Sequence, residues 1–101
     1  MSSVTLTSGE DGNWLIRGEL VFATVPKLLA QAAPLFNGQE ELVIDLSGVT
    51  HSDSAGLALV LEWLDECRQA GRGLRFRKPP QSMLDIARVS NVSDLLPLSS
   101  D

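Results

Sequence analysis

Asp53 and Ser54 are the polar residues best placed to act on another molecule, because an apolar helical segment begins directly after them. A side-chain oxygen at this position can accept a hydrogen bond from a free backbone N–H of the first helical turn, so either residue can cap the helix. The following residues Ala55 and Ala58 are small, and they leave the remaining donors and the positive end of the helix dipole open to a partner. The pattern predicts a helix cap at this site and also favours protein docking there.

The residues needed for catalysis or for metal binding are scarce. His51, the only histidine, stands three residues before Ser54, and a serine beside a histidine can act as a nucleophile and its base. Closeness along a loop does not provide the required geometry, so we expect an exposed loop histidine and no hydrolase activity. The single cysteine, Cys67, is expected to face the core, and the sequence has no CxxC motif and no GxxxxGK[ST] loop. We therefore predict no catalytic residue, no metal site and no cofactor.

The composition indicates a small cytoplasmic domain that does not bind nucleic acid. The 101 residues fit one domain, and the formal net charge is −5. The basic residues gather only weakly, from Arg68 to Lys78, where we expect them to favour a helix C-terminus and to flank a strand. A contact surface for acidic groups of a partner or for lipid headgroups is the alternative. We expect no signal peptide at the N-terminus and no segment that spans a membrane.

Strands and helices are expected to alternate along the chain. Apolar patterns predict strands at residues 4–7, 14–16, 42–44 and 74–77, and helices at 25–35, 55–70 and 82–89. A turn at residues 9–13 makes the first two strands a hairpin, which residues 18–20 close, and Phe22 is expected to pack beneath it. Residues 92–98 are expected to form a short helical turn before a loose tail at 99–101. The order β-β-α-β-α-β-α predicts an α/β fold with a mixed sheet packed against helices.

Several residues are expected to begin or end the helices. Thr24 is the expected cap of the first helix, and Pro34 is expected to distort or end its last turn. Asn37 and Gly38 are expected to stop that helix, and Gly71 the second.

Helical geometry separates a buried face and an exposed face of the second helix. Leu57, Val60, Leu61, Leu64 and Cys67 share the predicted core side. Leu59 and Trp63 fall at the border, where Trp63 can either pack at the core edge or anchor a partner. The first helix carries more apolar residues than one buried stripe needs, and Leu29 is the best candidate for a partner-facing residue. The predicted partner-binding set is Ser54, Ala55, Ala58, Leu59, Glu62, Trp63 and Leu29.

Residues 42–59 resemble the signature of the STAS domain family, which is named for sulfate transporters and anti-sigma factor antagonists. In that family an apolar strand ends in D-L-S and, after a short loop, D-S/T-x-G-L opens a helix; the matching sequence here is LVIDLSGVTHSDSAGLAL. Residues 18–20, Gly-Glu-Leu, resemble the family's step after its second strand. The resemblance implies a single STAS domain over residues 1–101 with the α/β fold of anti-sigma factor antagonists.

Two branches of the family are relevant. Antagonists of anti-sigma factors are switched by phosphorylation of a hydroxyl residue directly before the glycine, and here that position is Ala55. The other branch is the small STAS subunit of the Mla phospholipid ABC transporter of Gram-negative bacteria, which has a hydroxyl residue directly after the aspartate, as Ser54 is.

The resemblance to the transporter branch implies a function. We expect a non-catalytic subunit that binds and stabilises the transporter's ATPase, lies at the inner membrane only through the transporter, and serves outer-membrane lipid asymmetry. An anti-sigma factor antagonist is the alternative, and a nucleotide- or lipid-binding sensor is a third hypothesis.

Overall fold

A hairpin opens the chain, and strands then alternate with helices. The computed structural model describes residues 2–9, 13–37 and 41–98. The elements in chain order are β1 (Val4–Ser8), β2 (Trp14–Leu20), α1 (Val25–Ala32), the 3-10 helix η2 (Ala33–Asn37), β3 (Leu42–Ser52), α2 (Ser54–Gln69), β4 (Leu74–Arg77), α3 (Gln81–Val89) and the 3-10 helix η3 (Ser93–Leu95). The predicted order β-β-α-β-α-β-α is confirmed. The predicted turn residues 10–12, the helix stop at Gly38 and the tail at 99–101 lie outside the described residues.

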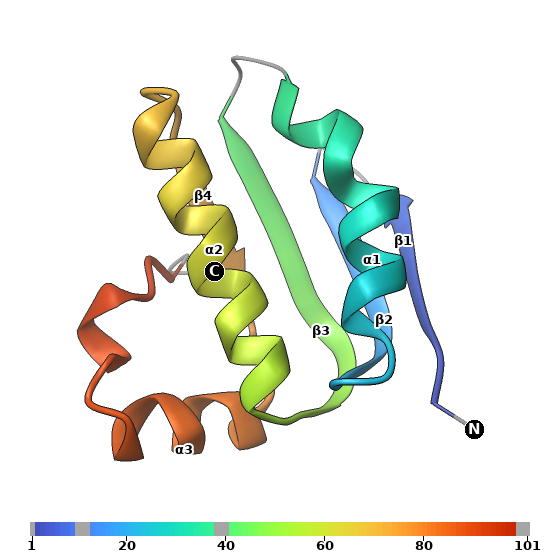
Figure 1. The fold of residues 1–101 in the computed structure, drawn as a ribbon, viewed down its shortest axis with the longest axis vertical. Helices are drawn as coiled ribbons and strands as arrows, with labels where there is room; N and C mark the ends of the chain where they lie inside the picture. The colour runs from blue at the N-terminus through green and yellow to red at the C-terminus, as the bar shows by residue number, and fades with distance from the viewer. Residues whose placement is uncertain (1, 10–12, 38–40, 99–101) are drawn as a thin grey trace.

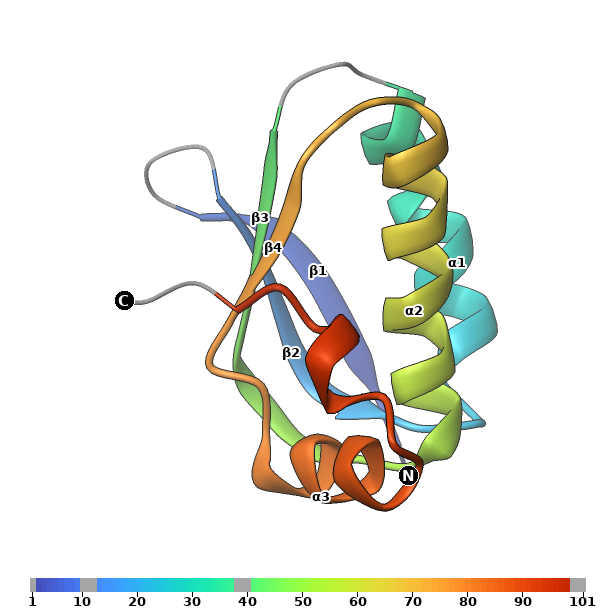
Figure 2. The same cartoon turned by 90° about the vertical axis from the view of Figure 1, so that its left-hand side faces the viewer.

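The strands form one mixed sheet in the order β1-β2-β3-β4. β1 and β2 are antiparallel, whereas β2 and β3, and β3 and β4, are parallel. Helices α1 and α2 lie side by side over the same face of this sheet (Figures 1 and 2), and α3 lies near the end of α2 at which that helix begins. The predicted α/β fold with a mixed sheet is therefore confirmed.

The core lies between the sheet and the helices α1 and α2. Ile16, Ile44 and Phe76 alternate with more exposed residues on their strands and are fully or almost fully buried. Trp63 of α2 joins them, and its ring stacks on Phe36 with the ring centroids 5.3 Å apart. Burying side chains of this size contributes about 1.5–3 kcal/mol each, so this layer is the main source of stability.

The third strand is much longer than the sequence pattern predicts. It continues from Leu42 to Ser52 instead of ending at Ile44, and β2 likewise includes the Gly-Glu-Leu step. The pairing shifts register in this region, because Leu15 pairs with Asp45 whereas Arg17 pairs with Gly48. Such a bulge allows polar residues and glycine to continue in a strand. Glycine is needed at position 48, because a Cβ atom there would lie 2.6 Å from Arg17 Cγ.

The first helix ends earlier than predicted. The α-helix stops at Ala32 and continues as a 3-10 turn that contains Pro34, which has no N–H to donate to an α-helical bond. Thr24 occupies the cap position, but its hydroxyl forms no cap bond, so that expectation is wrong. The hydroxyl instead donates its one hydrogen to Glu19 O at 2.6 Å, with Val21 O at 3.1 Å as the weaker second acceptor, and it accepts from Val21 N.

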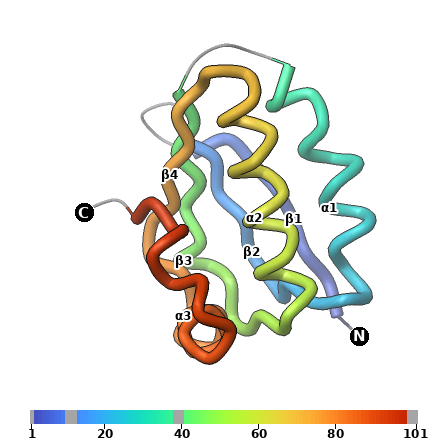
Figure 3. Tube along the Cα trace, turned by 60° about the vertical axis from the view of Figure 1, so that its left-hand side comes forward, coloured from blue at the N-terminus to red at the C-terminus, as the bar shows by residue number. Residues whose placement is uncertain are grey.

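The segment after α3 returns along the outer edge of β4 (Figure 3). Leu96 is buried in the core, and Phe76 N donates to Pro97 O at 3.0 Å, with Leu98 paired opposite Phe76. The predicted helical turn is η3. Among the described residues, no helix combines the length and the apolar character needed to cross a membrane.

Candidate functional site

The Asp53 carboxylate organises the beginning of α2. Its Oδ1 accepts hydrogen bonds from Ala55 N at 2.9 Å and Gly56 N at 3.3 Å, so Asp53 caps the helix. Its Oδ2 accepts a third bond from Phe22 N at 3.1 Å. Of the two cap candidates, Asp53 therefore caps the helix, whereas Ser54 is the first helical residue and is exposed. Its hydroxyl stands on the surface.

These bonds change the acidity of Asp53. Partial burial raises the pKa of the carboxyl group, but the N–H groups of Phe22, Gly56 and Ala55, with a smaller effect of His51, lower the pKa more. The net result is a pKa below the ordinary value of an aspartate. The cap is therefore charged at neutral pH, and it places a negative group against the positive end of the helix dipole.

Gly56 brings the start of α2 directly against the sheet. A Cβ atom at this residue would lie 2.3 Å from Ser52 Oγ and 2.5 Å from Leu20 O. Ser52 is fully buried, and its N–H donates to the Ser82 hydroxyl of α3 at 2.9 Å. The glycine therefore permits a close approach that positions the helix end between β2 and α3.

A groove of about 390 Å³ runs between α1 and the first half of α2. We call it the α1–α2 groove, and its lining is Phe22, Val25, Pro26, Leu29, Ala55, Ala58, Leu59 and Glu62. Small residues on α2 keep it open. Phe22 stands at the groove with 81% of its surface exposed, and Leu29 is 39% exposed. An apolar hollow beside an exposed aromatic ring is typical of a protein-binding surface.

The structure brings together most of the predicted partner-binding residues. Leu29, Ala55, Ala58, Leu59 and Glu62 all line the α1–α2 groove. Leu59 is only 3% exposed, so it contributes to the floor of the groove and not to its rim.

Trp63 was predicted as a border residue that could anchor a partner, and as a docking contact this prediction is wrong. It is 1% exposed, because its ring packs on Phe36. Helical spacing places Trp63 at the border between the two faces of α2. The sequence does not reveal that Phe36 of η2 covers this residue.

Phe22 lines the groove, although the sequence pattern predicts a buried residue. It was expected to pack beneath the hairpin, yet it is among the most exposed large apolar residues of the described chain. The Asp53 bond to its N–H holds it in the connection between β2 and α1. The sequence offers one sign of its exposure. Phe22 is an aromatic residue in the connection before Pro26, and it does not belong to an alternating apolar pattern of a strand.

The residues that could carry catalysis do not converge on this groove. His51 is exposed, as predicted, but it lies within β3 opposite Glu19 and not in a loop. Cys67 faces the core as predicted, and burial raises the pKa of its thiol. Within the described ranges, no three histidine, cysteine or acidic side chains cluster closely enough to hold a metal.

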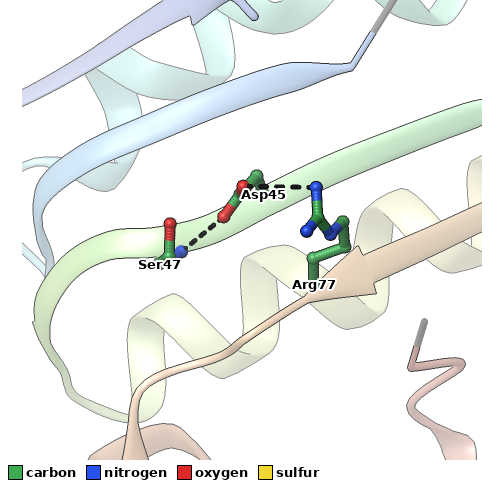
Figure 4. A network of polar contacts seen from close by, with 3 residues as sticks. All are labelled: Asp45, Ser47 and Arg77. Atoms are coloured by element: carbon green, nitrogen blue, oxygen red, sulfur yellow. Dashed lines mark hydrogen bonds and ion pairs between the residues drawn. The ribbon is translucent and has the colours of Figure 1, made fainter. Parts of the chain in front are cut away.

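The aspartate of the D-L-S sequence has a structural role. Asp45 accepts a hydrogen bond from Ser47 N at 2.8 Å, and its carboxylate lies 3.7 Å from the Arg77 guanidinium of β4 (Figure 4). Burial raises the pKa of Asp45, but the hydrogen bonds from Ser47 and the charges of Arg77 and Lys78 lower it by more, so the net pKa lies below the ordinary value of an aspartate. This pair connects two neighbouring strands, away from the α1–α2 groove.

Comparisons of sequence relate the chain to known proteins. The profile of the family described as MlaB, STAS domain, matches residues 7–97. The intermembrane phospholipid transport system binding protein MlaB of Haemophilus influenzae is 36% identical over 50 residues. That match covers 50% of this chain and 48% of the relative, so it spans about half the length of each.

Solved structures share the fold at low sequence identity. The anti-sigma factor antagonist SpoIIAA in its unphosphorylated form has a TM-score of 0.69 at 16% identity, over 97% of this chain and 89% of that one. The structure of a proposed anti-sigma factor antagonist from Thermotoga maritima has a TM-score of 0.75 at 15% identity, over 96% of this chain and 86% of that one. At these identities the likeness establishes the fold and not the partner.

Proposed function

The chain belongs to the MlaB-type STAS domain family, and from this premise we propose that it is a non-catalytic subunit that binds the ATPase of a phospholipid-transporting ABC complex. The α1–α2 groove is the proposed docking surface. The match to a binding protein of an intermembrane phospholipid transport system supports the choice of transporter. In this role the chain lies at the cytoplasmic face of the inner membrane through its partner.

The single observation that carries the proposal is the exposed apolar groove beside the capped start of α2. Phe22 and Leu29 expose apolar surface at a hollow whose α2 side is made small by Ala55 and Ala58. An apolar side chain or helix of a partner that enters this hollow would be desolvated against Phe22, which is how most interface hot spots gain their energy. Glu62, also at the groove, favours a basic residue on the partner.

The proposed mechanism is stabilisation of the assembled ATPase. The chain would contribute no catalytic group, and it would act by burying the groove against one conformation of its partner. A protein that binds one state of an equilibrium preferentially shifts the population toward that state.

A phosphorylation switch of the antagonist type fits these residues less well. Ala55 occupies the position directly before Gly56, and it has no hydroxyl to accept a phosphate. The N–H groups of both residues already donate to Asp53. An anti-sigma factor is therefore the alternative partner.

The test is co-expression with the ATPase of the same operon and, separately, with an anti-sigma factor kinase of the same organism, followed by affinity capture. Wild-type protein is expected to form a stoichiometric complex with the ATPase. Ser54→Glu should abolish this complex, because a larger charged side chain would stand directly beside Ala55, which lines the groove, and Phe22→Ala should weaken it at least tenfold. Capture of the kinase but not of the ATPase would overturn the transporter assignment.

The matched control is Ser93→Glu. Ser93 is also the first residue of a helix and is also exposed, but it belongs to η3, and its neighbour Asp94 does not line the α1–α2 groove as Ala55 does beside Ser54. It should bind like wild type. All variants are melted in parallel, since a large loss of thermal stability in Ser54→Glu would indicate that Ser54 has a structural role only.

A further inference from the structure

A second cavity, of about 500 Å³, lies on the side of α2 that faces away from α1. It is enclosed by the second half of α2, the beginning of β4 and η3, which stands beside α2 in Figure 1. Its lining is Leu61, Leu64, Cys67, Arg68, Arg72, Leu74, Asp94 and Leu95. Its volume is in the range of small-molecule sites, which is about 300–1,000 Å³. We call it the α2–η3 pocket.

The walls of this pocket are aliphatic. Four leucines and the Cys67 thiol supply the apolar lining, and none of its lining residues is aromatic. Leu95 of η3 is 59% exposed at the pocket although it is a large apolar residue. Flexible aliphatic side chains suit an alkyl chain better than they suit a nucleobase, which most often stacks on an aromatic ring.

The polar part of the pocket is net positive. Arg68 and Arg72 line it, whereas Asp94 is its one acidic residue. The Arg72 guanidinium is largely buried and donates to Leu35 O at 2.6 Å, so this charge is fixed in place. Arg68 is exposed, and the two ion pairs found between described residues, Arg77–Asp45 and Arg88–Asp85, do not involve it. Its guanidinium is free to meet a ligand.

This positive pocket is set in a protein of formal net charge −5. Long-range attraction therefore does not draw anions to the molecule, and a bound anion must be recognised locally. An aliphatic cavity with guanidinium groups complements a molecule that has one alkyl chain and one anionic head. Arginine is well suited to this task, because its planar fork can bind both oxygens of a carboxylate.

From the aliphatic walls and the adjoining guanidinium groups, we propose that the α2–η3 pocket binds a single-chain anionic lipid of the fatty-acid class. The alkyl chain lies among the leucines of α2, β4 and η3, and the carboxylate meets Arg68 at the last turn of α2. This site is separate from the α1–α2 groove and does not depend on the identity of the docking partner.

The experiment uses the isolated full chain and two probes of equal chain length, laurate below its micellar concentration and dodecanol below its solubility limit. Binding is measured by isothermal calorimetry and by displacement of a fluorescent polyene fatty acid. Wild type is expected to bind laurate with a Kd in the micromolar range and dodecanol at least tenfold more weakly. No laurate binding up to millimolar concentration, or equal affinity for both probes, would overturn the proposal.

Variants then locate the site. Arg68→Glu should weaken laurate binding at least tenfold and leave dodecanol binding unchanged. Arg88→Glu makes the same charge change at an exposed residue of α3 that does not line the pocket, and it should leave laurate binding unchanged. If the two variants weaken laurate binding equally, net charge and not the pocket is responsible, and the proposal fails.

Two further variants test the cavity itself. Leu64→Trp should fill the pocket and abolish the binding of both probes. If this variant does not fold, Leu95→Asp replaces it in the test and should likewise abolish binding, because Leu95 is exposed and its replacement spares the core. Either folded variant binding laurate like wild type would refute the assignment. Phe22→Ala should leave laurate binding intact, so the lipid site and the docking groove can fail independently.

Discussion

Replacing Gly56 with alanine should destabilise the protein, although alanine is the better helix former. The new Cβ would lie 2.3 Å from Ser52 Oγ, 2.5 Å from Leu20 O and 3.0 Å from Leu20 Cβ. None of these atoms can move freely, because Ser52 Oγ donates to Asp53 O at 3.0 Å and Leu20 O accepts from Asp53 N at 3.2 Å. Relief therefore requires a shift of the helix end.

The expected size follows from two opposing effects. Overpacking a tight site costs about 1–3 kcal/mol, whereas exchanging glycine for alanine in a helix gains up to about 1 kcal/mol. Because two of the contacts would be shorter than 3.0 Å, the cost should lie in the upper part of its range, and the net loss should be about 1–2 kcal/mol. Each kcal/mol lowers the Tm of a domain of this size by about 4–8 °C. Urea unfolding followed by the fluorescence of the two tryptophans measures it directly.

The control is the reverse exchange two residues later in the same helix. Ala58 is exposed, so Ala58→Gly should lose only the propensity difference of about 1 kcal/mol. If the packing argument is wrong, Gly56→Ala should instead gain about what Ala58→Gly loses. A rise in the urea midpoint of Gly56→Ala would refute the reasoning.

Three further predictions concern the cap, the core and the backbone. The pKa of Asp53 is lowered by folding, so its charge stabilises the protein fully above the unfolded pKa of about 4 and progressively less as the pH falls through the lower folded pKa. The Tm difference between wild type and Asp53→Asn should therefore be constant near neutral pH and shrink below about pH 4. A constant Tm difference down to pH 2 would contradict this prediction. Trp63→Ala should cost about 3–5 kcal/mol in urea unfolding, because the side chain is buried against Phe36; an unchanged midpoint together with loss of the partner complex would mean that Trp63 is a surface contact. Lys78 has a φ of 49°, so Lys78→Gly should raise stability by up to about 1 kcal/mol in thermal melting, and a lower Tm would show that the side chain contributes more than the backbone conformation costs.

The sequence predicts the elements of this fold better than their lengths. The apolar runs around Ile16, Ile44 and Phe76 fix which segments are strands, because burial between sheet and helices demands them. The end of β3 could not be predicted, since the residues from Ser47 to Ser52 resemble a loop. They remain in the sheet because a register shift against β2 accommodates Gly48, and such a shift depends on the neighbouring strand.

The candidate site was predictable where a single helix determines it. Helical spacing correctly puts Ala55, Ala58 and Glu62 on one open side of α2. It misplaces Trp63, which is covered by Phe36 of η2, and it gives no information on Phe22. Both outcomes depend on where α1 and its flanking turns cross α2, and that is a property of tertiary packing.

The carboxylate of Asp53 has a consequence for the thermodynamics of association. One acceptor group holds Phe22 on the α1 side of the groove and the first turn of α2 on the other side. The relative position of the two walls is thus set when the chain folds, before any partner arrives. A preformed surface loses less conformational entropy on binding, so more of the contact energy remains as affinity. Asp53→Ala should therefore lower the affinity for a partner even if Asp53 itself does not contact that partner, and the loss should appear chiefly in the entropy of binding.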